Sequence, residues 1–179
     1  MHVFLKFSAA IDWISERLGT LAAWTVLLAA SISAGNAFVR YGLDFSSNGW
    51  LEIQWYLFAA TVMLGAPLVL KRNEHVRVDL IYGSIGSKFQ VYVDIFGLIV
   101  FLLPVMGFMG WLSFPLFLKM LASGEVSSNA GGLVRWPAMM LLPLGFSWVF
   151  MQGLSEIVKR IAHLRGVIKM DTNYEKPVQ

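Results

Sequence analysis

Four long stretches of the chain contain no Asp, Glu, Lys or Arg, and they constrain the fold more than any other feature. They are residues 18–39, 53–70, 95–118 and 136–155. A helix rises about 1.5 Å per residue and the hydrocarbon core of a bilayer is about 30 Å thick, so each stretch is long enough to span it. The apolar residues run continuously rather than alternating, which favours helices over barrel strands. The sequence therefore predicts an all-α integral membrane protein with four transmembrane helices, at about residues 18–40, 50–70, 89–118 and 136–158.

The composition excludes several classes of protein. Charged residues make up 14% of the chain, against roughly 25% in an average soluble domain, and the mean hydropathy is +0.64. A soluble domain of 179 residues has too much surface to hide this much apolar area. An ordinary soluble enzyme and a disordered tail are therefore excluded. Because the chain has no cysteine, it cannot hold a disulfide, a thiolate zinc site or an iron–sulfur cluster.

The basic residues outside the predicted helices indicate how the chain is oriented. The N-terminal segment, the loop between the second and third helices and the C-terminal tail together hold eleven Lys and Arg, whereas the other two loops hold three. Basic residues concentrate on the cytoplasmic side of membrane proteins. We therefore expect both termini and the middle loop to lie in the cytoplasm.

The segments that flank the transmembrane domain, which we place at residues 18–165, are short. Residues 166–179 are expected to form a cytoplasmic tail. In residues 1–17, apolar residues recur at helical spacing, so this segment either lies in the membrane interface as a short amphipathic helix or extends the first transmembrane helix. Its acidic residues, Asp12 and Glu16, argue against a cleaved signal peptide. A second short interfacial helix is predicted in the middle loop, at residues 78–85.

Prolines and small residues predict where the helices bend and end. Pro67 is expected to bend the second helix and Pro104 the third, while Pro115 is expected to mark the outer end of the third helix. The loop at residues 122–132 is rich in small and polar residues. It is therefore either a flexible connector or a docking loop.

The predicted spans lack the chemistry of an ion pathway or a cofactor site. The three histidines, His2, His75 and His163, lie outside the spans, so a pair of haem ligands is not expected. Ion and proton pathways place ionisable residues at mid-membrane, and the four stretches contain none. No nucleotide-binding or catalytic motif stands in a convincing context. We expect no enzymatic activity, no cofactor, no metal and no nucleic-acid partner, and we expect a lasting contact with lipid and with another membrane subunit.

Four segments carry a resemblance to a known family. They are Arg40-Tyr41, residues 52–57 (Glu-Ile-Gln-Trp-Tyr-Leu), residues 73–79 (Asn-Glu-His-Val-Arg-Val-Asp) and residues 123–137, which end in Arg-Trp-Pro. In this order and with this topology, the chain from about residue 12 to 165 resembles the small membrane subunit of tripartite ATP-independent periplasmic (TRAP) transporters, the DctQ-like family. It is similar to the branch labelled for mannitol or chloroaromatic compounds.

The resemblance implies a role and two protein partners in the inner membrane of a bacterium. A DctP-like periplasmic solute-binding protein captures a small, usually carboxylated solute, and a large DctM-like permease subunit imports it with a sodium gradient. The small subunit would brace the large one and help to dock the binding protein. Sodium coupling would then belong to the large subunit, and this chain would hold no cofactor.

The resemblance also nominates residues at the two ends of the helices. The candidates for contacts between helices or subunits are Arg40, Tyr41, Glu52, Trp55, Asn73, His75, Arg77 and Asp79. The candidates for docking the binding protein are the outward charges Asp44, Lys119, Glu125 and Arg135. Arg40 and Glu52 are expected either to form an ion pair across the first loop or to be solvated separately.

Two other classes of protein compete with this interpretation. A self-sufficient four-helix carrier or channel would need a polar lining, and the spans offer little beyond Asn36 and a few Ser and Thr. A membrane anchor of another multi-subunit complex, such as a redox enzyme, would share the four helices, although a redox anchor would show haem-ligating histidines inside them.

Overall fold

The fold consists of long helices. We describe a computed structural model, which covers residues 1–45, 47–73 and 86–169. Its elements are α1 (His2–Leu43), α2 (Asn48–Arg72), α4 (Ser87–Gly97), the π-helical turn η1 (Leu98–Leu102), α5 (Leu103–Ser123) and α6 (Trp136–Leu164). Helices α4, η1 and α5 follow one another without a break. Four helices are long and apolar enough to cross a membrane, which confirms the predicted all-helical membrane fold.

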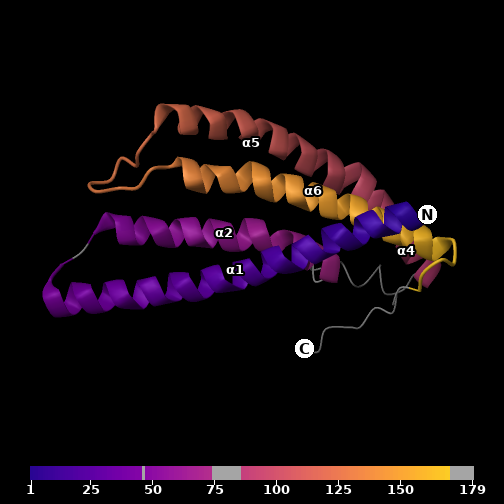
Figure 1. The fold of residues 1–179 in the computed structure, drawn as a ribbon, viewed down its shortest axis with the longest axis horizontal. Helices are drawn as coiled ribbons and strands as arrows, with labels where there is room; N and C mark the ends of the chain where they lie inside the picture. Colours follow the sequence, from indigo (N-terminus) through magenta and orange to yellow (C-terminus); the bar gives the residue numbers. More distant parts are fainter. Residues whose placement is uncertain (46, 74–85, 170–179) are drawn as a thin grey trace.

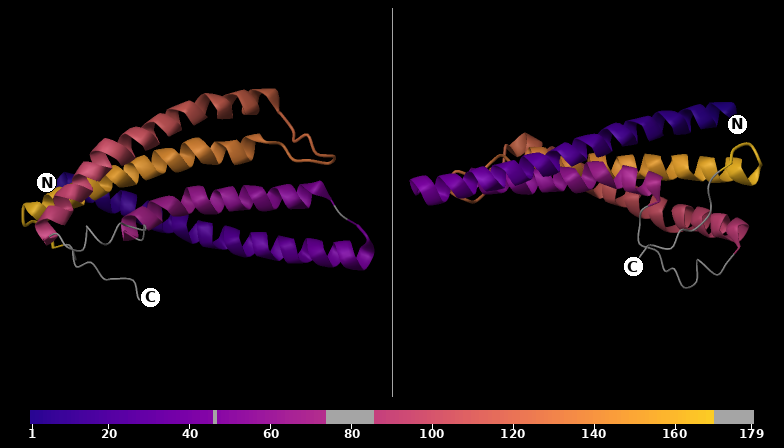
Figure 2. Two further views of the ribbon diagram at one scale, coloured as in Figure 1. Left: turned by 180° about the vertical axis from the view of Figure 1, so that it is seen from behind. Right: turned by 90° about the horizontal axis from the view of Figure 1, so that it is seen from below.

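The helices form an open, elongated layer rather than a compact bundle, and at one end of it α1 crosses over α6 (Figures 1 and 2). Helix α1 packs on α2, α2 on α6, and α6 on α5, while α1 also reaches α6. The N-terminus lies beside the end of α6, and we call this the N-terminal end of the layer. The links from α1 to α2 and from α5 to α6 lie at the opposite end, which we call the loop end.

The helices extend beyond the predicted spans. Helix α1 runs unbroken for 42 residues, or about 63 Å at the usual rise per residue, so residues 2–17 continue the first transmembrane helix. The third span continues to Ser123, and the expectation that Pro115 ends it is wrong. A proline inside a transmembrane helix removes one backbone hydrogen bond without ending the helix, because the freed carbonyl is satisfied locally.

Pro104 lies directly after the π-helical turn. The N–H of Leu103 donates to the carbonyl of Leu98, five residues earlier. Pro104, which has no N–H, follows directly in α5, so one backbone hydrogen bond is missing inside the continuous helix. The wide turn thus accommodates the proline within a continuous helix.

Few apolar side chains are buried, and they gather where the helices meet. Leu70, Leu98 and Val149 form a small core at the junction of α2, η1 and α6. Of the 18 most apolar consecutive residues of each spanning helix, at most 33% are buried inside the structure. In α1 and in the third span, only 6% are buried. Both broad faces of the layer are therefore apolar and uncovered by the chain itself.

Close helix contacts depend on glycine. A Cβ atom at Gly145 of α6 would lie 2.7 Å from the Cβ and 3.1 Å from the carbonyl oxygen of Met63 on α2. These distances are below van der Waals contact, and neither atom is at the end of a flexible side chain. Gly145 therefore sets how closely α6 approaches α2, as small residues do between membrane helices.

We expect Gly145→Ala to destabilise the protein by about 1–3 kcal/mol, the usual cost of overpacking. Thermal unfolding in detergent, followed by circular dichroism, measures the loss. Gly35→Ala is the control, because a Cβ there meets no atom within 4 Å and alanine favours the helix. Equal stability of the two variants would contradict the close approach at Gly145.

Candidate functional site

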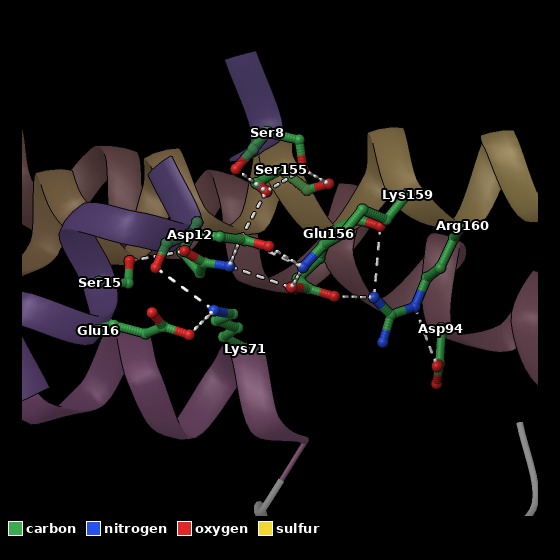
Figure 3. A network of polar contacts seen from close by, with 11 residues as sticks. Ser8, Asp12, Ser15, Glu16, Lys71, Asp94, Ser155, Glu156, Lys159 and Arg160 are labelled. Carbon is green, nitrogen blue, oxygen red and sulfur yellow. Dashed lines mark hydrogen bonds and ion pairs between the residues drawn. The ribbon is translucent and has the colours of Figure 1, made fainter. Parts of the chain in front are cut away.

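Polar side chains join α1 to α6 at the N-terminal end of the layer (Figure 3). We call them the α1–α6 polar network. Its members are Ser8, Asp12 and Ser15 on α1, Trp148, Gln152, Ser155, Glu156, Lys159 and Arg160 on α6, and Asp94 on α4. On each helix the members are spaced by one, three or four residues, so they lie on one face.

Asp12 is the centre of the network. One of its carboxylate oxygens accepts hydrogen bonds from Nε2 of Gln152 (2.9 Å) and Oγ of Ser155 (3.1 Å), and the other accepts from Nζ of Lys159 (2.9 Å). One turn earlier, the hydroxyls of Ser8 and Ser155 are 2.6 Å apart. A single carboxylate on α1 therefore binds three successive polar residues of one face of α6.

The network continues toward the middle of the layer through Gln152. The hydroxyl of Ser15 donates to Oε1 of Gln152 (2.7 Å) and accepts from the indole N–H of Trp148 (3.1 Å). Ser15 and Gln152 are both fully buried. Every polar atom of this group has a partner, which removes the penalty of burying an amide and a hydroxyl.

The charged part of the network ties α6 to α4. The carboxylate of Glu156 binds Nη1 of Arg160 at 2.6 Å and Nζ of Lys159 at 2.5 Å, and Nε of Arg160 binds the Asp94 carboxylate at 3.1 Å. The side chains of Glu156 and Arg160 are only 3% and 7% exposed. Among the described residues, no buried side-chain nitrogen or oxygen lacks a hydrogen-bond partner. Removing Arg160 would take one of two cations from Glu156 and the guanidinium from Asp94 in a buried site, which is destabilising.

A more exposed ion pair joins α1 to α2 beside this network. Nζ of Lys71 lies 2.6 Å from the Glu16 carboxylate, and the Glu16 side chain is 59% exposed. Such a pair is screened by solvent and contributes little to stability. It does, however, bring α2 to the same turn of α1 that holds Asp12 (Figure 3).

At the loop end, the carboxylate of Glu52 on α2 holds the loop between α5 and α6. One oxygen accepts hydrogen bonds from the hydroxyl of Ser127 and from Nδ2 of Asn129 (2.7 Å), and the other accepts from the backbone N–H of Leu133 (2.7 Å). Glu52 is 3% exposed. The loop is therefore fixed to a helix that is far from it in the sequence.

The loop itself is closed like a short hairpin. Val126 and Val134 form an antiparallel bridge, flanked by hydrogen bonds from Ser127 N–H to the Leu133 carbonyl and from Arg135 N–H to the Glu125 carbonyl, both 2.9 Å. The side chains of Glu125 and Arg135 form an ion pair at 2.7 Å. These contacts show that the loop has a defined shape and is not a flexible connector, while its role in docking stays a prediction.

The structure separates the residues nominated at the outer ends of α1 and α2. Arg40, Tyr41 and Trp55 are exposed, the last two at 85% and 66%, whereas Glu52 is buried. The expected Arg40–Glu52 ion pair is wrong, because the partners of the Glu52 carboxylate come from the α5–α6 loop. Nothing in the local sequence around Glu52 reveals partners about 75 residues away.

The other nominated residues fall into three groups. Asn73 caps α2 in the left-handed conformation, with φ of 60°, and His75, Arg77 and Asp79 lie outside the described residues. Asp44, which caps α1, and Lys119 are exposed. Glu125 and Arg135 are paired with each other and partly exposed, and their part in docking stays a prediction.

Sequence reasoning missed the α1–α6 polar network. One signal was present: Ser8, Asp12 and Ser15 follow one another at spacings of four and three residues, and polar residues continue the fourth apolar stretch at Gln152, Glu156 and Lys159. Two polar faces at the same end of the membrane need partners. Matching these two polar faces with each other would have predicted that α1 packs against α6.

The arrangement joins helices and shows no reaction centre. Within the described ranges, no group of three or more His, Cys, Asp or Glu side chains is placed to hold a metal ion. Both polar clusters link elements that are distant in sequence and have their polar atoms satisfied from within the chain.

Comparison with known proteins gives one family match. A family model for the DctQ component of tripartite ATP-independent periplasmic transporters matches residues 32–163, which is more than half of the chain. No curated protein and no solved structure gives a match. The matched range includes α2, α5 and most of α6, together with Glu52 and the loop that it holds.

We expect Arg160→Met to destabilise the protein by about 3 kcal/mol, because Glu156 and Asp94 would lose their shared cation in a buried site. Glu16→Gln is the control and is expected to have little effect, since its ion pair is exposed. Thermal unfolding in detergent compares the two variants. Equal and small effects would contradict a supporting role for the α1–α6 polar network.

Proposed function

We propose that this chain, which belongs to the DctQ family and is therefore the small membrane subunit of a TRAP transporter, braces the large permease subunit and helps to dock the periplasmic binding protein. The large subunit would be DctM-like and the binding protein DctP-like. The family gives the type of transporter. The uncovered apolar faces and the internally paired polar groups support the bracing role.

The observation that carries the proposal is the open layer of helices with two apolar faces. In the most apolar 18-residue stretch of each spanning helix, at most 33% of the residues are buried within the chain. Lipid or a partner must therefore cover the others. Membrane helices associate through packing and polar contacts. A broad, flat surface of this kind suits a lasting contact with a larger membrane protein, while the opposite face meets lipid.

The internal satisfaction of the polar groups supports a passive role. A transport pathway would need polar or ionisable groups that are available to a solute at mid-membrane. The four apolar stretches contain no charged residue, and the buried polar atoms of the described residues are paired within the chain. The solute site and the sodium coupling are therefore assigned to the large subunit.

The distribution of basic residues supports the proposed orientation. Most of the described Lys and Arg lie toward the N-terminal end, among them Arg72, Lys159 and Arg165, whereas Arg40, Lys119 and Arg135 lie toward the loop end. By the positive-inside rule, the N-terminal end faces the cytoplasm of a bacterial inner membrane. The α5–α6 loop then faces the periplasm, where a binding protein can reach it.

The solute is proposed at the level of chemical class. In this family of transporters we infer a small carboxylated solute, selected by the binding protein. The similarity to the branch labelled for mannitol or chloroaromatic compounds stays a prediction.

Purification from native membranes tests the proposal. We expect a tagged copy of the chain to bring down a large membrane permease in a fixed ratio. Liposomes with the chain alone should accumulate no solute, whereas liposomes with both subunits, the loaded binding protein and a sodium gradient should. A monodisperse chain without a membrane partner, or solute uptake against a gradient by the chain alone, would contradict the bracing role.

A further inference from the structure

The geometry at the loop end points to Glu52 as a positioning residue: we propose that it holds the α5–α6 loop in the shape that the periplasmic binding protein recognises. This inference rests on the proposed function. It goes beyond that function by assigning docking to a preformed hairpin and its shape to one carboxylate on another helix.

The α2 side chains that form hydrogen bonds with the loop lie on one face of the helix. Asn48, Glu52 and Tyr56 are spaced by four residues, so they lie above one another on the helix. Nδ2 of Asn48 donates to the carbonyl of Ala130 (3.0 Å), and the hydroxyl of Tyr56 donates to the carbonyl of Val134 (3.1 Å). Glu52 lies between them and binds three donors of the loop. These hydrogen bonds attach the loop to α2 between Ser127 and Val134.

Glu52 is the contact that determines the shape of the loop. Its two oxygens bind donors from three different loop residues, Ser127, Asn129 and Leu133, and hydrogen bonds to a charged acceptor are stronger than neutral ones. The loop backbone also passes very close to the carboxylate. A Cβ at Gly132 would lie 3.1 Å from Oε1 of Glu52 and 2.6 Å from the Cβ of Ser127.

The shaped loop presents an apolar surface rather than free charges. Val126 and Val134 face each other across the bridge and are 52% and 41% exposed. The flanking hydrogen bonds show that they form a non-hydrogen-bonded pair, so the N–H and carbonyl of Val126 point away from the bridge. The neighbouring charges of Glu125 and Arg135 neutralise each other. A soluble protein would therefore meet two valines and one open backbone edge, beside the exposed polar residues Ser128 and Asn129.

The binding protein is the occupant that this placement favours. The loop lies at the end of the layer with few basic residues, which the positive-inside rule assigns to the periplasm. Its polar residues, including Ser128 and Asn129, are exposed to solvent. The loop is therefore accessible to a soluble partner. A loop that is already ordered loses less conformational freedom on binding, and this raises affinity.

The test uses the complete transporter, with this chain, the large subunit and the loaded binding protein in liposomes. We expect Glu52→Ala to leave the yield of the co-purified large subunit unchanged. The binding-protein concentration at half-maximal transport should rise by about tenfold or more, because the loop must then be ordered on binding. The maximal rate at saturating binding protein should change little.

Rescue by the conservative variant separates positioning from charge. In Glu52→Gln, the amide carbonyl still accepts from Leu133, while the new NH₂ group donates to the Ser127 hydroxyl and to an Asn129 amide that has rotated. We expect this variant to behave nearly as the unaltered chain does. Gln54→Ala is the control on the same helix, because the Gln54 side chain bonds only within α2, to the carbonyl of Trp50.

Each outcome has a distinct meaning. An unchanged half-saturating concentration in Glu52→Ala, or loss of the large subunit from that variant, overturns the positioning role. If Glu52→Ala does not accumulate, the double variant Ser127→Ala with Asn129→Ala removes two of the three donors from the loop side, and an unchanged half-saturating concentration there overturns it too. Failure of the unaltered chain to bind the large subunit would instead overturn the proposed function.

Discussion

The structure depends on the requirement that polar groups buried beside lipid be satisfied within the chain. At the N-terminal end, Asp12 of α1 binds three polar residues of α6, and Arg160 continues the contact to α4. At the loop end, Glu52 of α2 binds the loop that leads into α6. These two clusters connect the α1–α2 hairpin to the α5–α6 hairpin at opposite ends of the layer. With so few buried apolar side chains, directional polar contacts set the relative positions of the helices.

The same polar contacts explain why the helices can form an open layer without a central apolar core. A soluble four-helix protein needs a central core, because burial of apolar surface drives its folding. In lipid that drive between helices is absent, so an open layer of helices is as well solvated as a bundle. Close contacts such as Gly145 with Met63 and the two polar clusters then suffice to hold the layer. Its free apolar faces are what a bracing subunit needs.

The helices could be predicted from sequence, but the contacts between them could not. The four apolar stretches predicted the spans because length and hydropathy are local properties of the chain. The sequence leaves open whether residues 2–17 extend α1, because the partner of Asp12 and Ser15, Gln152, lies far away in the chain. For the same reason, it offers Arg40 or solvent as the partner of Glu52, and not Leu133. The prediction that Pro115 ends the third span was wrong because the effect of a proline depends on how neighbouring groups satisfy the freed carbonyl.

The central claim is that the four helices form a layer of fixed shape that does not move while the partner transports. The chain has no native cysteine, so spin labels at Phe38→Cys on α1 and Leu121→Cys on α5 would report the separation of the two edges of the layer at the loop end. Both positions are exposed. We expect one narrow distance distribution, unchanged by the large subunit, sodium or solute. A broad distribution in the isolated chain, or a shift between transport states, would contradict it.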